Sequence, residues 1–371
     1  MRYSGVRKIM EYIIIYGNPP IPAPDILKIQ NLLKQANMIC TAREFESFDK
    51  YSIYSYLKEK DIFHAPTRAL VDRNILTDII SLVNGKEIDS ASESVRLSAA
   101  LMAFLQCSNI LIEPSISLYE YASLNSSESV KDELYQFRIA DNIHPKVYTD
   151  IALNRKNIIT EHDKAKVDIK KIEKPKNGVD YQRRLSHWNF NYTLVLKMAM
   201  FEVGPLQPKE KLANFIKWMS QEFYFGAVGV LFANIYFSNK RMRKMIKSIR
   251  SNDKKKALAG VKNITWDLTL LTQWSRYVKE QAPTNTLWLL CSRDKLIMKI
   301  APMIMGPKDD LEIANIVRNL FRIYWGDTIG EEIYQLYSDC RKGNRNHSVD
   351  YLNNLMLNLE KEFLGWQGVP P

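Results

Sequence analysis

Two short apolar runs, each followed by an acidic residue, constrain the fold of this chain most strongly. Residues 69–71 read Ala-Leu-Val and lead into Asp72, while residues 287–291 read Leu-Trp-Leu-Leu-Cys and lead through Ser292 to Asp294. Runs of this length are typical of buried strands, and helical patterns separate them. Strands that alternate with helices indicate a parallel sheet, in which the carboxyl ends of the strands share one ligand-binding edge. We therefore expect both acids at the same edge.

Helical patterns account for most of the remaining chain. Apolar residues at helical spacing predict helices over 26–39, 94–106, 266–279, 314–324, 331–340 and 349–363. A third short strand is expected over 109–113, and Pro114 suits the first turn of the helix that follows it. Residues 155–180 are rich in Lys, Asp and Glu and predict a solvated linker. These patterns together predict an α/β fold with extensive added helices.

Composition narrows the class of protein. The chain has 371 residues, which exceeds the usual size of one domain, and 46% of them are hydrophobic, so it can bury a sizeable core. A net charge of +11 and a pI near 9.2 favour a polyanionic partner. No apolar run approaches the length of a membrane span, no signal peptide is evident, and the four cysteines show no paired spacing. We therefore expect a cytoplasmic protein with no membrane partner.

Four carboxylates form the candidate site. Asp72 and Asp294 follow the two apolar runs, Glu120 lies on the helix expected after Pro114, and Asp267 opens the stretch that begins at Trp266. Carboxylate oxygens are the ligands that Mg²⁺ and Mn²⁺ prefer. Such close negative charges would repel one another without a cation and would raise at least one pKa. The pattern therefore predicts a site for Mg²⁺ or Mn²⁺ that supports metal-assisted hydrolysis.

The order and context of these acids resemble the PIN-domain nucleases. In that family an Asp ends the first strand with an Asn two residues later, as in Asp72-Arg73-Asn74, and a Glu follows on a helix after the second strand, as Glu120 does. A third Asp begins a helix, as Asp267 is expected to, and a fourth follows Ser or Thr by two positions, as in Ser292-Arg293-Asp294. The resemblance implies a three-layer α/β/α core with a central parallel sheet.

The resemblance also implies a division of the chain. The PIN-like nuclease core would comprise residues 66–125 and 260–305. Residues 1–65 would form an N-terminal helical extension, 126–259 a helical insertion with the charged linker, and 306–371 a C-terminal helical region.

The activity implied by the resemblance is that of a metal-dependent endonuclease, acting on RNA in preference to DNA. Asp72, Glu120, Asp267 and Asp294 would hold the metal and carry catalysis, with Asn74 and Ser292 hydrogen-bonded to a ligand carboxylate, water or phosphate. Many relatives are toxins or act in defence against foreign nucleic acid, which implies an inhibitory or regulatory protein partner and is compatible with an oligomer.

Two other interpretations fit the same residues. The chain could be a catalytically silent PIN-like subunit that binds nucleic acid or serves as a scaffold. It could also be a helical adaptor in which Asp72, Asp267 and Asp294 are helix N-caps and Glu120 faces solvent. Metal-dependent cleavage that Asp72→Asn abolishes would distinguish the nuclease from both of these alternatives.

A basic segment supplies the candidate nucleic-acid surface. Within residues 239–256, cations recur at helical spacing with apolar residues on another face, which predicts a basic amphipathic helix that either contacts phosphates or is simply solvated. The cations are Lys240, Arg243, Lys244, Lys247 and Arg250. A second segment, residues 183–192, interleaves charge with aromatics, and for it helical core packing is favoured over base stacking.

Overall fold

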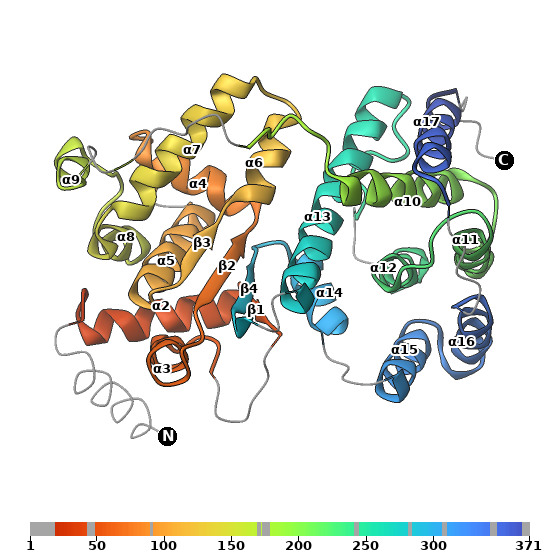
Figure 1. Cartoon of the computed structure of the whole chain (residues 1–371), viewed down its shortest axis with the longest axis horizontal. Coiled ribbons are helices and arrows are strands. Elements are labelled where there is room, and N and C mark those ends of the chain that lie inside the picture. The colour runs from red at the N-terminus through yellow and green to blue at the C-terminus, as the bar shows by residue number, and fades with distance from the viewer. Residues whose placement is uncertain are drawn as a thin grey trace. The chain divides into compact units, whose positions relative to one another are not determined.

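The chain divides into two units that are each described separately. The computed structural model describes residues 19–42, 49–89, 92–168, 172, 179–240, 245–280, 284–305, 310–341 and 347–365. The first unit comprises Met1–Arg183 and Gln273–Met298, and the second comprises Arg184–Thr272 and Lys299–Pro371. Helix α13 (Lys254–Glu280) contributes to both units (Figure 1). Within the described residues, no helix combines the length and apolarity that crossing a membrane requires.

The first unit contains a small mixed sheet. Its strands are β1 (Ile39–Thr41), β2 (Thr67–Val71), β3 (Leu111–Glu113) and β4 (Leu287–Cys291), in the order β1-β4-β2-β3. Strand β2 is parallel to both β3 and β4, whereas β1 is antiparallel to β4. The three strands predicted from the sequence are therefore confirmed, and the sheet belongs to an α/β fold.

The prediction of an all-parallel sheet is wrong because of β1, which lies in the segment expected to be a helical extension. Helix α2 (Ala23–Ala36) ends at Asn37, whose φ of 49° places it in the left-handed region. This residue stops the helix, and the chain then runs back along β4, with Ile39 opposite Cys291. The helical spacing predicts a helix over 26–39, which runs into this strand, so β1 is not recognised in the sequence.

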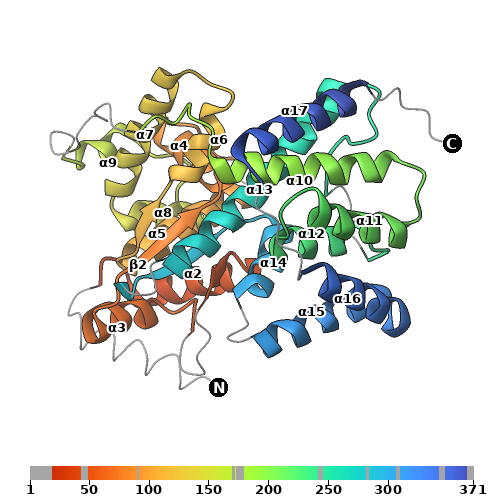
Figure 2. The same cartoon turned by 45° about the vertical axis from the view of Figure 1, so that its right-hand side comes forward.

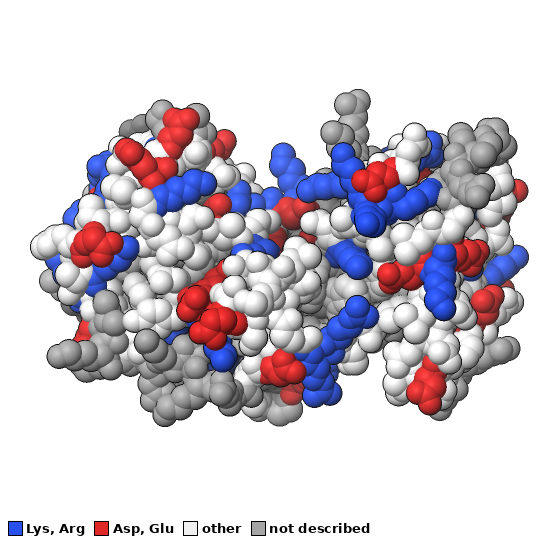
Figure 3. All heavy atoms as spheres, turned by 90° about the horizontal axis from the view of Figure 1, so that it is seen from above, with Lys and Arg blue, Asp and Glu red and all other residues white. Residues whose placement is uncertain are grey.

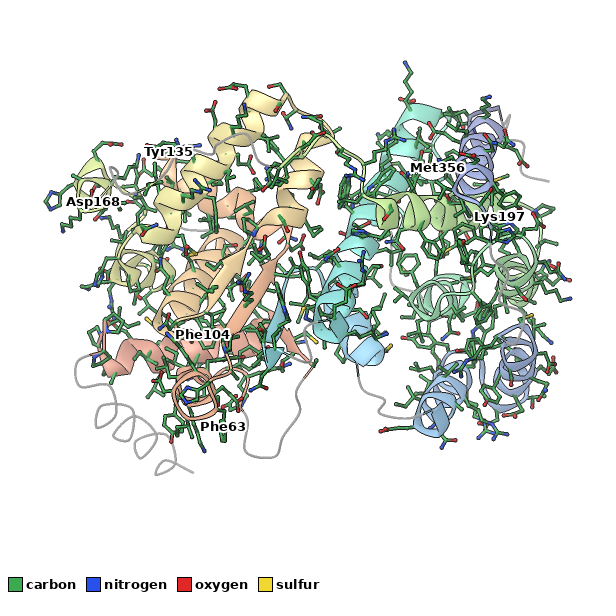
Figure 4. The ribbon with its side chains drawn as sticks, in the orientation of Figure 1. Phe63, Phe104, Tyr135, Asp168, Lys197 and Met356 are labelled. Atoms are coloured by element: carbon green, nitrogen blue, oxygen red, sulfur yellow. The ribbon has the colours of Figure 1, made fainter. Side chains whose placement is uncertain are left out.

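Helices cover both faces of the sheet. On one face Ala69 and Val71 of β2 join an apolar core that includes Phe104, which Figure 4 labels on α5. On the other face the Trp274 indole of α13 donates a hydrogen bond to the Trp288 carbonyl of β4, with 3.1 Å between nitrogen and oxygen. The remaining helices in the described part of the first unit are α3 (Ile53–Phe63), α4 (Arg73–Val83), α5 (Glu93–Cys107), α6 (Ser115–Ala122), α7 (Ser127–Asn142), α8 (Pro145–Ala152) and α9 (Glu161–Ala165), and Figure 2 shows them from a second direction.

Part of the expected solvated linker is folded. Within residues 155–180 the structure describes 155–168, 172 and 179–180, and the first of these stretches contains α9. The side chains of Ile159 and Val167 are buried in the core of the first unit, which anchors this stretch. A few scattered apolar residues among many charges are a weak pattern, which is why the sequence suggested a linker.

The second unit is helical in its described part. It contains α10 (Ser186–Val203), α11 (Pro208–Gln221), α12 (Ala227–Phe237), α15 (Asp310–Trp325), α16 (Asp327–Arg341) and α17 (Val349–Gly365), and α14 (Lys295–Met305) begins in the first unit and ends in the second. Trp188 of α10 is buried and its ring stacks on Tyr192 with centroids 4.7 Å apart. Residues 183–192 thus contribute to core packing, as predicted. Lys197, labelled in Figure 4, lies 5.5 Å from the Trp218 ring.

The predicted basic amphipathic helix is wrong for residues 239–240 and 245–253, and only residues 254–256 of the segment's described part are helical, at the start of α13. Arg243 and Lys244 lie outside the described residues, while 245–250 form bends and turns. The physical reason is the close approach of this segment to α13, because a Cβ built on Gly260 would lie only 1.9 Å from the Lys247 carbonyl oxygen. The backbone around Lys247 occupies the space of a side chain, and Ser248 has a φ of 57°.

The Gly260 contact gives a first testable prediction. Replacement by Ala places the new methyl group inside the contact radius of the Lys247 backbone, which cannot move aside as a flexible side chain could. Gly260→Ala should therefore lower the free energy of unfolding by about 1–3 kcal/mol or more, measured by urea denaturation. Gly365→Ala is the matched control, because nothing lies within 4 Å of its added Cβ, and it should be neutral. Equal stability of the two variants would contradict the described packing.

Candidate acidic site

Three of the four predicted carboxylates belong to one edge of the first unit. Because β2 is parallel to β3 and β4, the carboxyl ends of the three strands meet at this edge. Asp72 directly follows β2, Asp294 follows β4 by three positions, and Glu120 lies on α6 after β3. The backbone N–H of Asp72 also donates to the Cys291 carbonyl at 3.0 Å, which extends the β2–β4 pairing to the site.

Asp72 is held by the two side chains predicted to support it. Its Oδ2 accepts hydrogen bonds from Ser292 Oγ at 2.5 Å and from Asn74 Nδ2 at 2.7 Å. The side chain does not cap α4, since it makes no cap hydrogen bond to the helix. Burial is the main cause that raises the pKa of Asp72, and the negative charge of Asp294 raises it further against the opposing hydrogen bonds.

The Glu120 side chain is partly buried, and its carboxyl binds a proton more tightly than an ordinary glutamate does. Its pKa is raised to about 8, first by burial and then by the negative charge of Asp72, while the positive charge of Arg73 opposes the shift. A carboxyl with this pKa is largely protonated at neutral pH. The alternative interpretation, in which Glu120 faces solvent, is therefore wrong.

Asp294 does have the cap geometry that the alternative interpretation predicted. Its Oδ1 accepts hydrogen bonds from the backbone N–H groups of Leu296 at 2.7 Å and Ile297 at 3.2 Å, at the start of α14. Ser292 Oγ accepts from the Asp294 backbone N–H at 2.9 Å and donates to Asp72, so one hydroxyl links the two acids. The two cap hydrogen bonds both go to Oδ1 of the carboxylate.

Both arginines next to these acids are paired with other carboxylates. Arg73 forms an ion pair with Glu133, and Arg293 donates to Asp78 at 2.6 Å. Among the described residues no Lys, Arg or His side chain forms an ion pair with Asp72, Glu120 or Asp294. The edge therefore retains a surplus of negative charge when these acids ionise.

Asp267 lies in the other unit. It was expected to begin a helix, but α13 starts at Lys254, so Asp267 lies within the helix and does not cap its start. The helix is extended because Asp253 accepts from the N–H groups of Lys255 and Lys256 and provides the N-terminal cap. Whether Asp267 joins the other carboxylates stays a prediction from the sequence.

The donor atoms at the edge fit a divalent cation held by few protein ligands. No three His, Cys, Asp or Glu side chains among the described residues are grouped closely enough to enclose a metal ion. Mg²⁺, however, is commonly held by one or two carboxylates, with water and substrate phosphate completing its coordination. Asn74 Oδ1, beside Asp72, is buried and has no hydrogen-bond partner among the described groups, so it can accept from a metal-bound water.

The structure adds residues that the sequence did not indicate. Glu113 ends β3 at the same edge and accepts from the Ser115 N–H at 3.1 Å. Glu113 escaped the rule that selected Asp72 and Asp294, an acid after a buried strand, because β3 is not buried and Glu113 is its last residue. Tyr277 of α13 had no such signal, because its place next to β4 depends on tertiary packing.

Comparison with known proteins finds no match for this chain among protein-family models, curated proteins or solved structures.

Proposed function

We propose that the first unit is the catalytic part of a PIN-like, metal-dependent endonuclease, with Asp72, Glu120 and Asp294 as its metal-binding acids. The observation that carries this proposal is the group of strand-edge carboxyls that form no ion pair with a basic side chain in the described part of the chain. Burying such a group raises the pKa values of its members, and a bound cation would offset that cost. Asp267 lies in the second unit and is not assigned to this site.

Each residue has a distinct task in this proposal. When bound, Mg²⁺ or Mn²⁺ supplies a water of lowered pKa and offsets negative charge on the attacked phosphate. Asp72 and Glu120 would hold the cation in their ionised forms. Ser292 and Asn74 fix the rotamer of Asp72 through their hydrogen bonds. The Asp294 oxygen that does not cap α14 would face the same cation.

The proposed substrate is a phosphodiester backbone, RNA in preference to DNA, and the choice of RNA rests on the resemblance alone. The net charge of +11 supports a polyanionic partner. A toxin or defence role with a regulatory protein partner is the corresponding biological proposal.

The test is cleavage of end-labelled single-stranded RNA and DNA by the full chain with Mg²⁺, Mn²⁺ or EDTA. We expect internal cuts that require a divalent cation. The cap geometry of Asp294 and the lack of an enclosed three-ligand group favour, as second candidate, a silent subunit that binds nucleic acid. Salt-sensitive binding without cleavage under any of these conditions would select that second candidate.

The basic surface of the second unit gives a prediction about binding. Lys247, Lys255 and Lys256 are exposed around the start of α13, and Figure 3 shows Lys and Arg side chains gathered on that face. Their replacement by Gln should weaken binding about equally for all sequences and flatten the slope of log K against log salt by up to about 0.7–0.9 per lost phosphate contact. Fluorescence anisotropy at several salt concentrations measures this slope.

The control for that variant is the triple replacement of Lys60, Lys86 and Lys217 by Gln, which removes the same charge from exposed positions elsewhere. Arg250 is left intact because it forms an ion pair with the buried Glu202. Identical salt slopes for the two triple variants would show that the α13 face is only solvated.

A further inference from the structure

Three tyrosines of the first unit lie on or against the elements that lead to the acids. Tyr119 precedes Glu120 on α6, and its ring lies 5.0 Å from the Tyr181 ring between centroids, tilted by 59°. Tyr277 of α13 stacks on Trp288 of β4 with centroids 4.1 Å apart. All three tyrosines are partly exposed, so ring surface remains available to a ligand. They come from three separate parts of the sequence.

Glu113 is a charged neighbour of Tyr181 and Tyr277. Burial raises the pKa values of Tyr181 and Tyr277, and the negative charge of Glu113 is the next cause for both. Burial also raises the pKa of Tyr119, and the charges of Asp180 and Tyr277 add to the shift while Arg183 opposes it. The direct contact between the Tyr119 and Tyr181 rings, together with these charge neighbours, places the three rings and the Glu113 carboxyl in one group.

The cluster is fixed in place before any ligand arrives. Tyr181 packs against the apolar cluster that contains Leu118 of α6. The next residue, Gln182, donates from Nε2 to the Asn125 carbonyl at 2.9 Å, which ties this irregular segment to the end of α6. A preformed aromatic surface loses little conformational entropy when it binds a flat ligand.

We infer that Tyr119, Tyr181 and Tyr277 form a stacking site for an unpaired nucleobase beside the scissile phosphate, so that the substrate is single-stranded at the point of cleavage. This inference rests on the proposed function. Aromatic rings stack on every base, and a base within a duplex is already stacked on its neighbours. Glu113 repels phosphate and accepts N–H groups, so it suits the edge of a base and not the backbone.

The inference is tested by binding, without need of catalysis. Full-length Asp72→Asn in EDTA is titrated with a single-stranded oligonucleotide that carries one 2-aminopurine, whose fluorescence is quenched by stacking. Adding Tyr119→Leu or Tyr181→Leu should weaken binding by about tenfold and reduce the quenching, whereas Tyr119→Phe should preserve both. Tyr54→Leu, a partly exposed tyrosine on α3, is the matched control.

A measurement on the ligand avoids any effect of substitution on folding. An oligonucleotide with an abasic site at each position in turn should bind about tenfold more weakly at one position, and a duplex of the same sequence should compete poorly. Equal affinity for all abasic ligands, or equal affinity for duplex and single strand, would overturn the inference. Absence of metal-dependent cleavage by the wild type, with these binding effects intact, would overturn only the proposed nuclease activity.

Discussion

Asp72→Asn is expected to reduce metal-dependent cleavage by at least about a hundredfold without weakening the folded protein. The groups that merely orient metal ligands contribute about 10–100-fold in such sites, so loss of a ligand should cost more. In the absence of metal, burial raises the pKa of the Asp72 carboxyl, which means that its ionised form is unfavourable in the folded protein. Because Asn carries no charge, the stability of the variant in EDTA should equal or exceed that of the wild type. Initial rates with Mg²⁺ and melting temperatures in EDTA measure the two effects.

The matched control is Glu161→Gln, which removes one negative charge from an exposed side chain of the same unit. It should retain full activity and so exclude a contaminating nuclease or a general charge effect. A clear drop in the melting temperature of Asp72→Asn, together with unchanged cleavage, would instead indicate that the Asp72 hydrogen bonds serve only to hold the strand ends together.

The part of the site that follows from strand order could be predicted from the sequence. Apolar runs of this length form parallel strands, and parallel strands place the residues that follow them at one edge. This reasoning places Asp72 near Ser292, and the hydrogen bond between them confirms it. The position of Asn74 could also be predicted, because it lies in the first turn of α4, two residues after Asp72, where its side chain can hydrogen-bond to the Asp72 carboxylate.

Features that depend on contacts between distant segments could not be predicted. The cations around Lys247 have helical spacing, yet a close backbone contact at Gly260 holds this segment in turns. Tyr277 contacts the sheet from α13, the helix whose Trp274 also bonds to β4. Periodicity describes one element at a time, whereas these positions are set by the packing of two elements.

Glu120→Gln is expected to make the metal-free protein more stable at high pH. The folded-state pKa of Glu120 is about 8, against an ordinary value of 4.5. Between these pH values the folded state binds more protons than the unfolded state, so the free energy of unfolding falls as the pH rises toward 8. Glutamine does not titrate and so avoids this loss of stability. At pH 9 in EDTA the free energy of unfolding of the variant should exceed that of the wild type by on the order of a few kcal/mol.

Melting temperatures at pH 5 and pH 9 should therefore diverge between the two proteins only at the higher pH. Added Mg²⁺ should stabilise the wild type more than the variant, because a cation favours the ionised carboxylate that Gln lacks. Glu128→Gln, an exposed site on α7, should follow the wild type throughout. If Mg²⁺ stabilised wild type and Glu120→Gln equally, Glu120 would be a buried neutral acid with no part in metal binding, and the proposed site would reduce to Asp72 and Asp294.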